Sequence, residues 1–488
     1  MVGIRAYGGY IPRFRMNRFV IFGAMGWINP ANMLNAQGEK AVANFDEDSV
    51  TMAVAAGIDC MKGLKRDEIG GVYFASTTAP YKERLNANIV SGALAAKETI
   101  RTADFAGGLK AGTTALLAAM DAAKTKSANN IVVTASDCRL GKMGSAQELL
   151  FGDGAAAFLV GNNNKDIIAE LKGSFSSGYD FVDHFRGAET KYDRQWEDRW
   201  MRDVGIGQFM PEAVEGLCKK SKVDISEFSK VIYPTYYGGA RKKMNKMMNL
   251  GPEKVQDNMQ AVVGDTGTAQ PLVMLAKALE EAKPGDKLLV LSYGSGCDAL
   301  YFEVTENITR FAPRKGVSGS LANRAELDNY QKYLAWRRMI SVETGLRGEE
   351  DKVTRWSLVW RNHKMILGML GSRCKKCKTQ HFPPQRICVN PECGAVDRME
   401  PVYLSDKGGK VFSFTSDMLA ATINPPAMYG GIDINGGGRF QMDFTDCTID
   451  DLAVGKQVEF SFRIKFYDSR RDITNYFWKA VPIAEEAK

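Results

Sequence analysis

Short apolar runs rich in β-branched and aromatic residues alternate with longer amphipathic stretches over the first 310 residues of the chain. Runs of the first kind occupy residues 72–74, 131–135, 156–160, 231–233 and 288–292. The stretches between them, such as 113–124 and 271–282, are rich in Ala and Met and have the length of helices. Strands that alternate with helices predict an α/β layered fold with a mostly parallel sheet.

The pattern changes after residue 310. Residues 311–322 have the composition of a connector, and the next stretch, 323–340, places Leu327, Tyr330 and Leu334 on one face, which predicts a helix. From residue 410 onward, apolar and polar positions alternate between glycine turns, with strand-like runs at 411–414, 439–442 and 458–466. This alternation predicts an all-β unit, a small barrel, at the end of the chain.

Length and composition fit several ordinary globular domains. A chain of 488 residues is too long for one core, and 45% hydrophobic with 25% charged residues is typical of globular protein. The apolar run at 19–28 is about half the length of a membrane span and has no cleavage-type tail. The nine cysteines do not form a secreted disulfide framework. We therefore predict a cytoplasmic protein without membrane association.

The net charge of +7 raises the question of nucleic-acid binding, and its distribution argues against it. Residues 1–310 and 371–488 each carry an excess of only one positive charge, whereas residues 311–370 hold 11 basic against 6 acidic side chains. A nucleic-acid module usually carries its positive charge on the binding domain itself. The basic segment could equally hold an acidic partner surface, the phosphates of coenzyme A, or only solvent.

Four of the cysteines crowd into twenty positions and have the spacing of a metal site. Cys374 and Cys377 form a Cys-x₂-Cys knuckle, and Cys388 and Cys393 follow as a second, longer pair. Two such pairs complete a tetrahedral Cys₄ shell for Zn²⁺, which leaves no open coordination position. The sequence therefore predicts a structural zinc site. His381 is a spare candidate ligand, although its place beside Phe382-Pro383-Pro384 is typical of a loop.

Several motifs resemble those of a known family. Residues 2–13, 46–53, 110–113, 152–157 and 283–287 are similar to archaeal-type HMG-CoA synthases of the thiolase superfamily, over about the first 305 residues. Residues from about 325 to 485 resemble the zinc-ribbon plus OB-fold proteins that accompany thiolases and HMG-CoA synthases. The resemblance implies a duplicated thiolase fold at 1–310, a basic helical linker at 311–370, a ribbon at 371–398 and an OB-fold at 399–488. It also implies that the Lys110 segment lies beside the Gly294–Gly296 loop.

The resemblance fails at the catalytic positions of the family. Those enzymes use a cysteine nucleophile, a histidine and a glutamate general acid/base, and the matching slots hold Leu109, Tyr233 and Thr77. Leucine has no nucleophilic atom, and threonine cannot act as a base near neutral pH. The asparagine of the family appears as Asp265. The resemblance therefore implies a chain without the catalytic residues of its relatives.

Other residues are weaker candidates for the missing chemistry. Cys297, in a glycine loop that borders the active site in the family, is the alternative nucleophile, but no histidine is visible to activate it. Cys60, Cys218 and Cys447 have the surroundings of packing residues. The chain has three histidines, and none follows a predicted core strand.

Three hypotheses follow from these observations. The first is a non-catalytic HMG-CoA synthase-like subunit that acts as structural and substrate-channel partner of an active thiolase-type subunit, in a hetero-oligomer that makes or cleaves C–C bonds of acyl-CoA. The second is an active acyltransferase with a displaced nucleophile. The third, a nucleic-acid-binding ribbon/OB protein, is opposed by the charge balance of residues 371–488. The first hypothesis implies structural zinc and, for the complex, a coenzyme A thioester as possible ligand.

Overall fold

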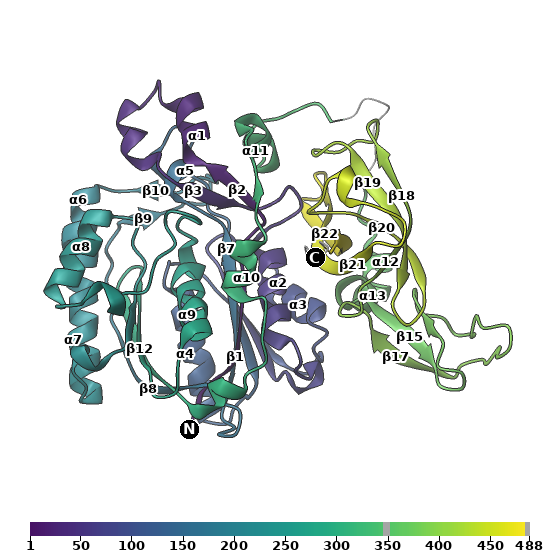
Figure 1. Cartoon of the computed structure of the whole chain (residues 1–488), viewed down its shortest axis with the longest axis horizontal. Coiled ribbons are helices and arrows are strands. Elements are labelled where there is room, and N and C mark those ends of the chain that lie inside the picture. The colour runs from purple at the N-terminus through teal and green to yellow at the C-terminus, as the bar shows by residue number, and fades with distance from the viewer. Residues whose placement is uncertain (345–351, 484–488) are drawn as a thin grey trace, which may run out of the picture. The chain divides into compact units, whose positions relative to one another are not determined.

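The computed structural model describes residues 1–344 and 352–483, which form two compact units (Figure 1). The first contains residues 1–43, 48–90 and 97–330, and the second contains residues 44–47, 91–96 and 331–488. Within the described residues, no helix is both long and apolar enough to cross a membrane.

The first unit is built on a nine-stranded sheet. Its order is β11 (Lys230–Ile232), β12 (Lys287–Tyr293), β13 (Cys297–Val304), β8 (Ala169–Ser176), β1 (Gly3–Tyr10), β7 (Gly154–Gly161), β6 (Ile131–Asp137), β4 (Gly71–Ala75) and β5 (Arg101–Phe105). Outward from the centre, the strands β8, β13, β12 and β11 repeat the arrangement of β1, β7, β6 and β4, with the same pairing directions. The sheet is therefore an internal duplication, as the resemblance implied.

The prediction of a mostly parallel sheet is wrong. Parallel pairs join β4 to β5, β4 to β6 and β11 to β12, whereas the other five pairings are antiparallel. The reason is local: β12 returns as β13 through the tight turn at 294–296, and only antiparallel strands can be joined by so short a connection. The predicted strand positions themselves agree with the structure.

Helices cover the sheet from both halves of the duplication. In the first half, α2 (Ser49–Met61) packs on β1, β6 and β7, and α4 (Ala111–Lys124) packs on β4 and β6. In the second half, α7 (Met210–Ser221) packs on β8 and β13, and α9 (Gln270–Glu281) contacts α4. The buried faces of α4 and α9 belong to one hydrophobic core with the sheet. Because α4 begins at Ala111, this packing fixes the position of Leu109 just before it.

Smaller elements complete the first unit. They are β2 (Phe14–Asn17), α1 (Arg18–Met25), β3 (Glu39–Val42), α5 (Ala146–Leu150), β9 (His184–Phe185), β10 (Arg194–Gln195), α6 (Asp198–Trp200), α8 (Gly238–Met247), α10 (Gly316–Ala322) and β14 (Ala325–Glu326). The helix α3 (Asn86–Ala93) begins in the first unit, and its last residues are assigned to the second. A π-helical turn spans Met201–Phe209, and short 3₁₀ turns include Gly267–Ala269.

The helix predicted at 323–340 is shorter than expected. Its first part forms β14, which pairs with β2, and only α11 (Tyr330–Trp336) is helical. Arg338 adopts a left-handed conformation with φ of 52°, and its amide bonds to the carbonyl of Ala335. A left-handed residue at this place ends a helix, which the hydrophobic pattern does not reveal.

The second unit contains two short helices, a ribbon and a β-rich domain. The helices are α12 (Trp356–Arg361) and α13 (His363–Gly368), and the ribbon contains β15 (Leu370–Cys374), β16 (Gln380–His381) and β17 (Met399–Tyr403). The last sheet has the order β20 (Arg439–Asp443), β19 (Ala427–Ile434), β18 (Gly409–Asp417), β21 (Gln457–Asp468) and β22 (Ile473–Pro482). A bridge between Phe444 and Ala480 brings its two edges together, which is how a sheet closes into a barrel. The predicted fold class is confirmed, and the last domain is consistent with an OB-like barrel.

Buried charges hold residues 44–47 within this second unit. The Arg463 guanidinium forms ion pairs with Glu47, at 2.5 Å, and with Asp446. The Lys479 ammonium lies 2.9 Å from the Asp46 carboxylate, and both side chains are almost completely buried. These ion pairs join residues 44–47 to side chains that lie about 400 positions or more later in the chain.

Candidate functional site

A cavity of about 50 Å³ opens in the first unit beside Leu109. Apolar side chains line part of it, among them Met201, Ile206 and Pro271. The rest of the wall is polar and aromatic, and is made of Arg139, Asp183, His184, Thr235, Tyr236, Tyr237, Asp265, Ser292 and Tyr293. An apolar pocket with a few convergent polar groups is the usual form of a small-molecule site.

Two of the residues predicted at family positions line this cavity. Leu109 stands at the start of α4, and Asp265 approaches from the loop before Gly267. Gly294 packs against the backbone of Leu109 so closely that a Cβ at this glycine would lie 2.8 Å from the Leu109 amide nitrogen. The expected proximity of the Lys110 segment to the Gly294–Gly296 loop is therefore present.

Thr77 is not among the lining residues, because its side chain is committed elsewhere. Its hydroxyl donates to the Asp137 carboxylate at 2.9 Å, and its amide donates to the same group at 2.8 Å. Asp137 is fully buried at the end of β6, and it also accepts from the amide of Thr268 at 2.8 Å. Asp137 thereby ties the Thr77 loop to the turn at 267–269. The Thr77 side chain stabilises the fold and does not face the cavity.

Tyr233 also lies outside the wall of the cavity, and its neighbours Pro234 and Thr235 take part instead. The ring is fully buried after β11, and its hydroxyl contacts the side-chain oxygen of Asn245 and, at 3.2 Å, the carbonyl of Arg241. Burial raises the pKa of Tyr233 to about 12. The phenol is therefore a neutral hydrogen-bond donor near neutral pH.

Cys297 has an environment that does not suit a nucleophile. Its side chain is fully buried at the start of β13 and is absent from the wall of the cavity. Burial raises the pKa of the Cys297 thiol, and the adjacent Asp298 carboxylate raises it further. Because the thiolate is the reactive form, both effects reduce nucleophilicity. Cys60 is also fully buried, with its pKa raised by burial to about 12.

His184 lines this cavity, although the sequence pattern does not predict a histidine there. The hairpin of β9 and β10 places His184 opposite Gln195, so that its Nε2 lies 2.8 Å from Oδ2 of Asp193. Asp193 also accepts from Arg139 Nε at 2.7 Å and from Arg186 at 2.7 Å. His184 and Asp193 therefore form a hydrogen-bonded pair at the wall of the cavity.

The charges around this pair are strongly stabilised. Burial by itself raises the pKa of the Asp193 carboxyl, but Arg139 and His184 outweigh it and hold the pKa below its usual range. Burial lowers the pKa of Arg139, but Asp193 and Asp265 outweigh that effect and raise it. Asp193 is therefore ionised and Arg139 protonated throughout the neutral range. His184 lies in the long segment between β8 and α6, which lacks a clear hydrophobic period. A search based on hydrophobic patterns therefore passes over this histidine.

Tyrosines form a third group in the wall. The Tyr293 hydroxyl donates to the Asp183 carboxylate, and burial together with this carboxylate raises the pKa of Tyr293. Burial likewise raises the pKa of Tyr236, whose hydroxyl donates to that of Tyr237. These phenols stay protonated near neutral pH, so they act in the cavity as hydrogen-bond donors and as aromatic surface.

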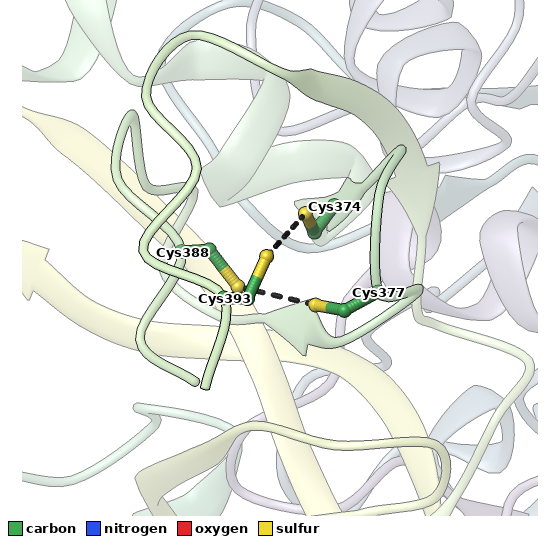
Figure 2. A group of neighbouring side chains, drawn as sticks. All are labelled: Cys374, Cys377, Cys388 and Cys393. Atoms are coloured by element: carbon green, nitrogen blue, oxygen red, sulfur yellow. Dashed lines mark hydrogen bonds between the residues drawn. The ribbon is translucent and has the colours of Figure 1, made fainter. Parts of the chain in front are cut away.

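The predicted Cys₄ site is assembled in the ribbon (Figure 2). The sulfurs of Cys374, Cys377, Cys388 and Cys393 all lie within 4.8 Å of one another, with contacts of 3.8 Å and 3.4 Å between pairs. A tetrahedral shell with Zn–S bonds of about 2.3 Å separates its sulfurs by roughly 3.8 Å. The four thiols therefore fit zinc, and the prediction of a Cys₄ ribbon is confirmed.

His381 belongs to the frame of the ribbon. It lies in β16, opposite Ser372 of β15, and its side chain is almost fully buried. Its Nε2 accepts from the amide of Val389 at 3.3 Å, next to Cys388 in the chain. His381 thus binds the backbone next to Cys388. It lies in a strand, whereas the sequence had suggested a loop.

Comparison with known proteins agrees with this description. Residues 370–397 match the family described as ChsH2, rubredoxin-like zinc ribbon domain. Over 315 residues, the chain is 30% identical to a hydroxymethylglutaryl-CoA synthase of Methanopyrus kandleri, covering 63% of this chain and 89% of the relative. A synthase of the same description from Caldivirga maquilingensis is 29% identical over 352 residues, covering 70% of this chain and 99% of the relative.

Solved structures show the same fold. PksG, an HMG-CoA synthase from Bacillus subtilis, matches with a TM-score of 0.59 and 20% identity, covering 69% of this chain and 89% of that one. An HMG-CoA synthase complexed with CoA matches with a TM-score of 0.58 and 18% identity, covering 68% and 89%. The fold is therefore of the thiolase-like class. Within that class, the chain belongs to the hydroxymethylglutaryl-CoA synthase family, and it carries a ChsH2-type zinc ribbon.

Proposed function

We propose that this chain is an acyl-CoA-binding subunit that does not form the acyl-cysteine intermediate of its family and works beside an active thiolase-type subunit. The observation that carries the proposal is that Leu109 lines the cavity, and the motif resemblance to the family assigns the nucleophile to this position. The described residues that line the cavity include no cysteine. Among the described lining residues, a thioester that enters this cavity meets no cysteine thiol able to take its acyl group.

Preservation of the surrounding fold supports a retained use. Gly294 still packs against Leu109, and the Asp137 carboxylate still gathers the Thr77 loop and the Thr268 turn. We propose that the cavity accepts the acyl end of a coenzyme A thioester, since a related synthase structure is a complex with CoA. The reaction served is the making or cleaving of a C–C bond next to the thioester. The partner subunit supplies the thiolate.

The ribbon and the OB-like domain give this subunit a second functional part. In the proposal, zinc held by the four cysteines stabilises the ribbon and takes no part in the reaction, because four ligands complete its tetrahedral coordination shell. The OB-fold domain then contributes to the interface with the partner or to the path of the substrate. A cytoplasmic location belongs to the same proposal.

Two alternatives have less support. An active acyltransferase with a displaced nucleophile would need a reactive cysteine, and burial of Cys297 raises the pKa of its thiol. A nucleic-acid-binding ribbon/OB protein would need a basic surface, and residues 371–488 carry an excess of one positive charge.

Binding of acetyl-CoA by the full chain, measured by isothermal titration calorimetry, tests the ligand. Leu109→Trp should fill the cavity and weaken binding at least tenfold. Leu64→Trp is the matched control, because Leu64 is partly exposed and does not line the cavity. Equal affinity of both variants would refute acyl-CoA binding in this cavity.

Light scattering tests the partner. Co-expression with a thiolase-family subunit from the same genome should give a complex larger than a homodimer, and C–C bond cleavage or condensation should require both chains. A chain that stays a homodimer and leaves the rates of such subunits unchanged would refute the partnership.

A further inference from the structure

His184 and Asp193 form a unit that the chemistry of the family does not use. The family's histidine position follows β11, whereas His184 lies in the hairpin between β8 and α6, far from it in the sequence. His184 of this pair lines the same cavity as Leu109. We infer that His184 is a general acid/base that exchanges a proton with the α-carbon of an acyl-CoA thioester bound beside Leu109. The inference rests on the acyl-CoA binding proposed above.

The hydrogen bonds of the pair determine which nitrogen is available. Asp193 is an ionised acceptor, because Arg139 and Arg186 both donate to it. The 2.8 Å contact with His184 therefore places the ring proton on Nε2. A neutral His184 then carries its lone pair on Nδ1, which has no hydrogen-bond partner among the described residues. This arrangement orients a base in the way that a carboxylate orients a catalytic histidine.

The pair is well fixed. Asp193 is almost completely buried, and its amide donates to the carbonyl of Leu140 at 3.0 Å. His184 is held through the β9–β10 pairing, and its own amide donates to Asp183 at 2.7 Å. The His184 side chain retains 15% of its exposure, which is enough to meet a ligand in the cavity. Because the imidazole is already held in place and its Nδ1 carries the lone pair, a proton transfer to it needs little rearrangement of the site.

The proton transfer balances without any further reagent. Nδ1 of His184 takes a proton from the carbon next to the thioester carbonyl, so that a C–H bond breaks and an N–H bond forms. The electron pair of the C–H bond is delocalised onto the thioester oxygen, near the positive charge of Arg139, which also lines the cavity. Return of the proton regenerates the thioester. No covalent acyl-enzyme is needed, which agrees with leucine at position 109.

Deuterium exchange tests this directly. The full chain is incubated with acetyl-CoA in D₂O, and deuteration of the acetyl methyl group is followed by mass spectrometry. We expect exchange above the buffer rate, and a loss of about 100-fold or more in His184→Ala, the range of a lost general base. His363→Ala is the matched control, because His363 stacks on Trp360 in the second unit and is no part of the cavity. It should exchange at the wild-type rate.

Two further measurements separate a chemical role from a structural one. The affinity of His184→Ala for acetyl-CoA should stay within about twofold of the wild type, and added imidazole should restore part of its exchange rate, in the manner expected for a missing base. Wild-type protein that binds acetyl-CoA without accelerating exchange would overturn this inference and leave the proposed function standing. Equal exchange by His184→Ala would also overturn it. A wild-type chain that binds no acetyl-CoA would overturn both.

Discussion

Nζ of Lys110 lies 3.0 Å from Oδ1 of Asp298, and this ion pair ties the start of α4 to β13 beside Leu109. The Asp298 carboxylate is almost completely buried and also accepts from the hydroxyl of Thr113 at 2.8 Å. The pair joins the two halves of the duplicated fold next to Leu109. It therefore fixes the backbone on one side of the cavity.

Removal of the cation should cost stability. Lys110→Met leaves the Asp298 carboxylate buried with hydroxyl donors only. Breaking a buried pair typically costs about 3–5 kcal/mol, and because Lys110 is one-fifth exposed and Thr113 still donates, we expect about 2 kcal/mol. Urea unfolding followed by tryptophan fluorescence measures the change. Lys65→Met removes an exposed pair with Glu68 and should cost below about 1 kcal/mol. Equal losses in both variants would contradict the assigned role of Asp298.

Incubation with acetyl-CoA should leave the intact mass of the chain unchanged. Leu109 has no atom that can attack a thioester, and the raised pKa of the Cys297 thiol keeps it protonated. Leu109→Cys should not restore synthase activity, because Thr77 donates to Asp137 and Tyr233 to Arg241, so neither is placed as a base. Intact-mass spectrometry and a condensation assay measure both outcomes. A stable acyl adduct on the wild-type chain would refute the proposed loss of covalent chemistry.

Zinc should be bound at about one ion per chain and should matter only locally. Cys374→Ser removes one of four thiolates, and we expect loss of zinc and protease sensitivity across 370–403. The first unit should keep its unfolding midpoint, since the cysteines belong to the second unit. Cys218→Ser is the matched control and should retain the metal. Elemental analysis with limited proteolysis distinguishes the variants, and a zinc-free ribbon that resists protease would contradict the prediction.

The buried ion pairs of Asp46 should make the second unit sensitive to acid. Burial alone raises the pKa of Asp46, but Lys479 and Arg463 outweigh it and lower the pKa below its ordinary value. A lowered native pKa contributes stability that is fully present above the unfolded value of about 3.9 and is lost as the pH falls through the native pKa. Asp46→Asn should therefore cost about 3 kcal/mol at pH 7.

The difference between wild type and Asp46→Asn should shrink as the pH falls from about 4 through the lowered native pKa, because a protonated Asp46 is as neutral as asparagine. Urea unfolding across this pH range measures it. Asp433→Asn, which removes an exposed pair with Arg439, should change stability by less than about 1 kcal/mol at any pH. A constant Asp46→Asn difference down to pH 2 would show that the ion pairs do not contribute.

The sequence predicts those features that are determined by residues close together in the chain. The strand at 131–135 and the helix at 113–124 agree with β6 and α4, because buried elements leave continuous apolar patterns. The Cys₄ ribbon was predictable because its ligands lie within twenty positions. The end of α11 was not, since it depends on the left-handed Arg338. His184 was missed because its environment is made by Arg139 and Asp193, which only the tertiary fold brings to it.

The ion pair between Asp46 and Lys479 also has a consequence in time. The two residues are 433 positions apart in the chain. At a synthesis rate of about 5–20 residues per second, Asp46 leaves the ribosome roughly 20–90 s before its partner exists. During that interval the carboxylate of Asp46 must stay hydrated, so residues 44–47 cannot take their final place. Completion of the second unit therefore waits until Lys479 has been made, and a nascent chain released before that point would carry Asp46 without its partner.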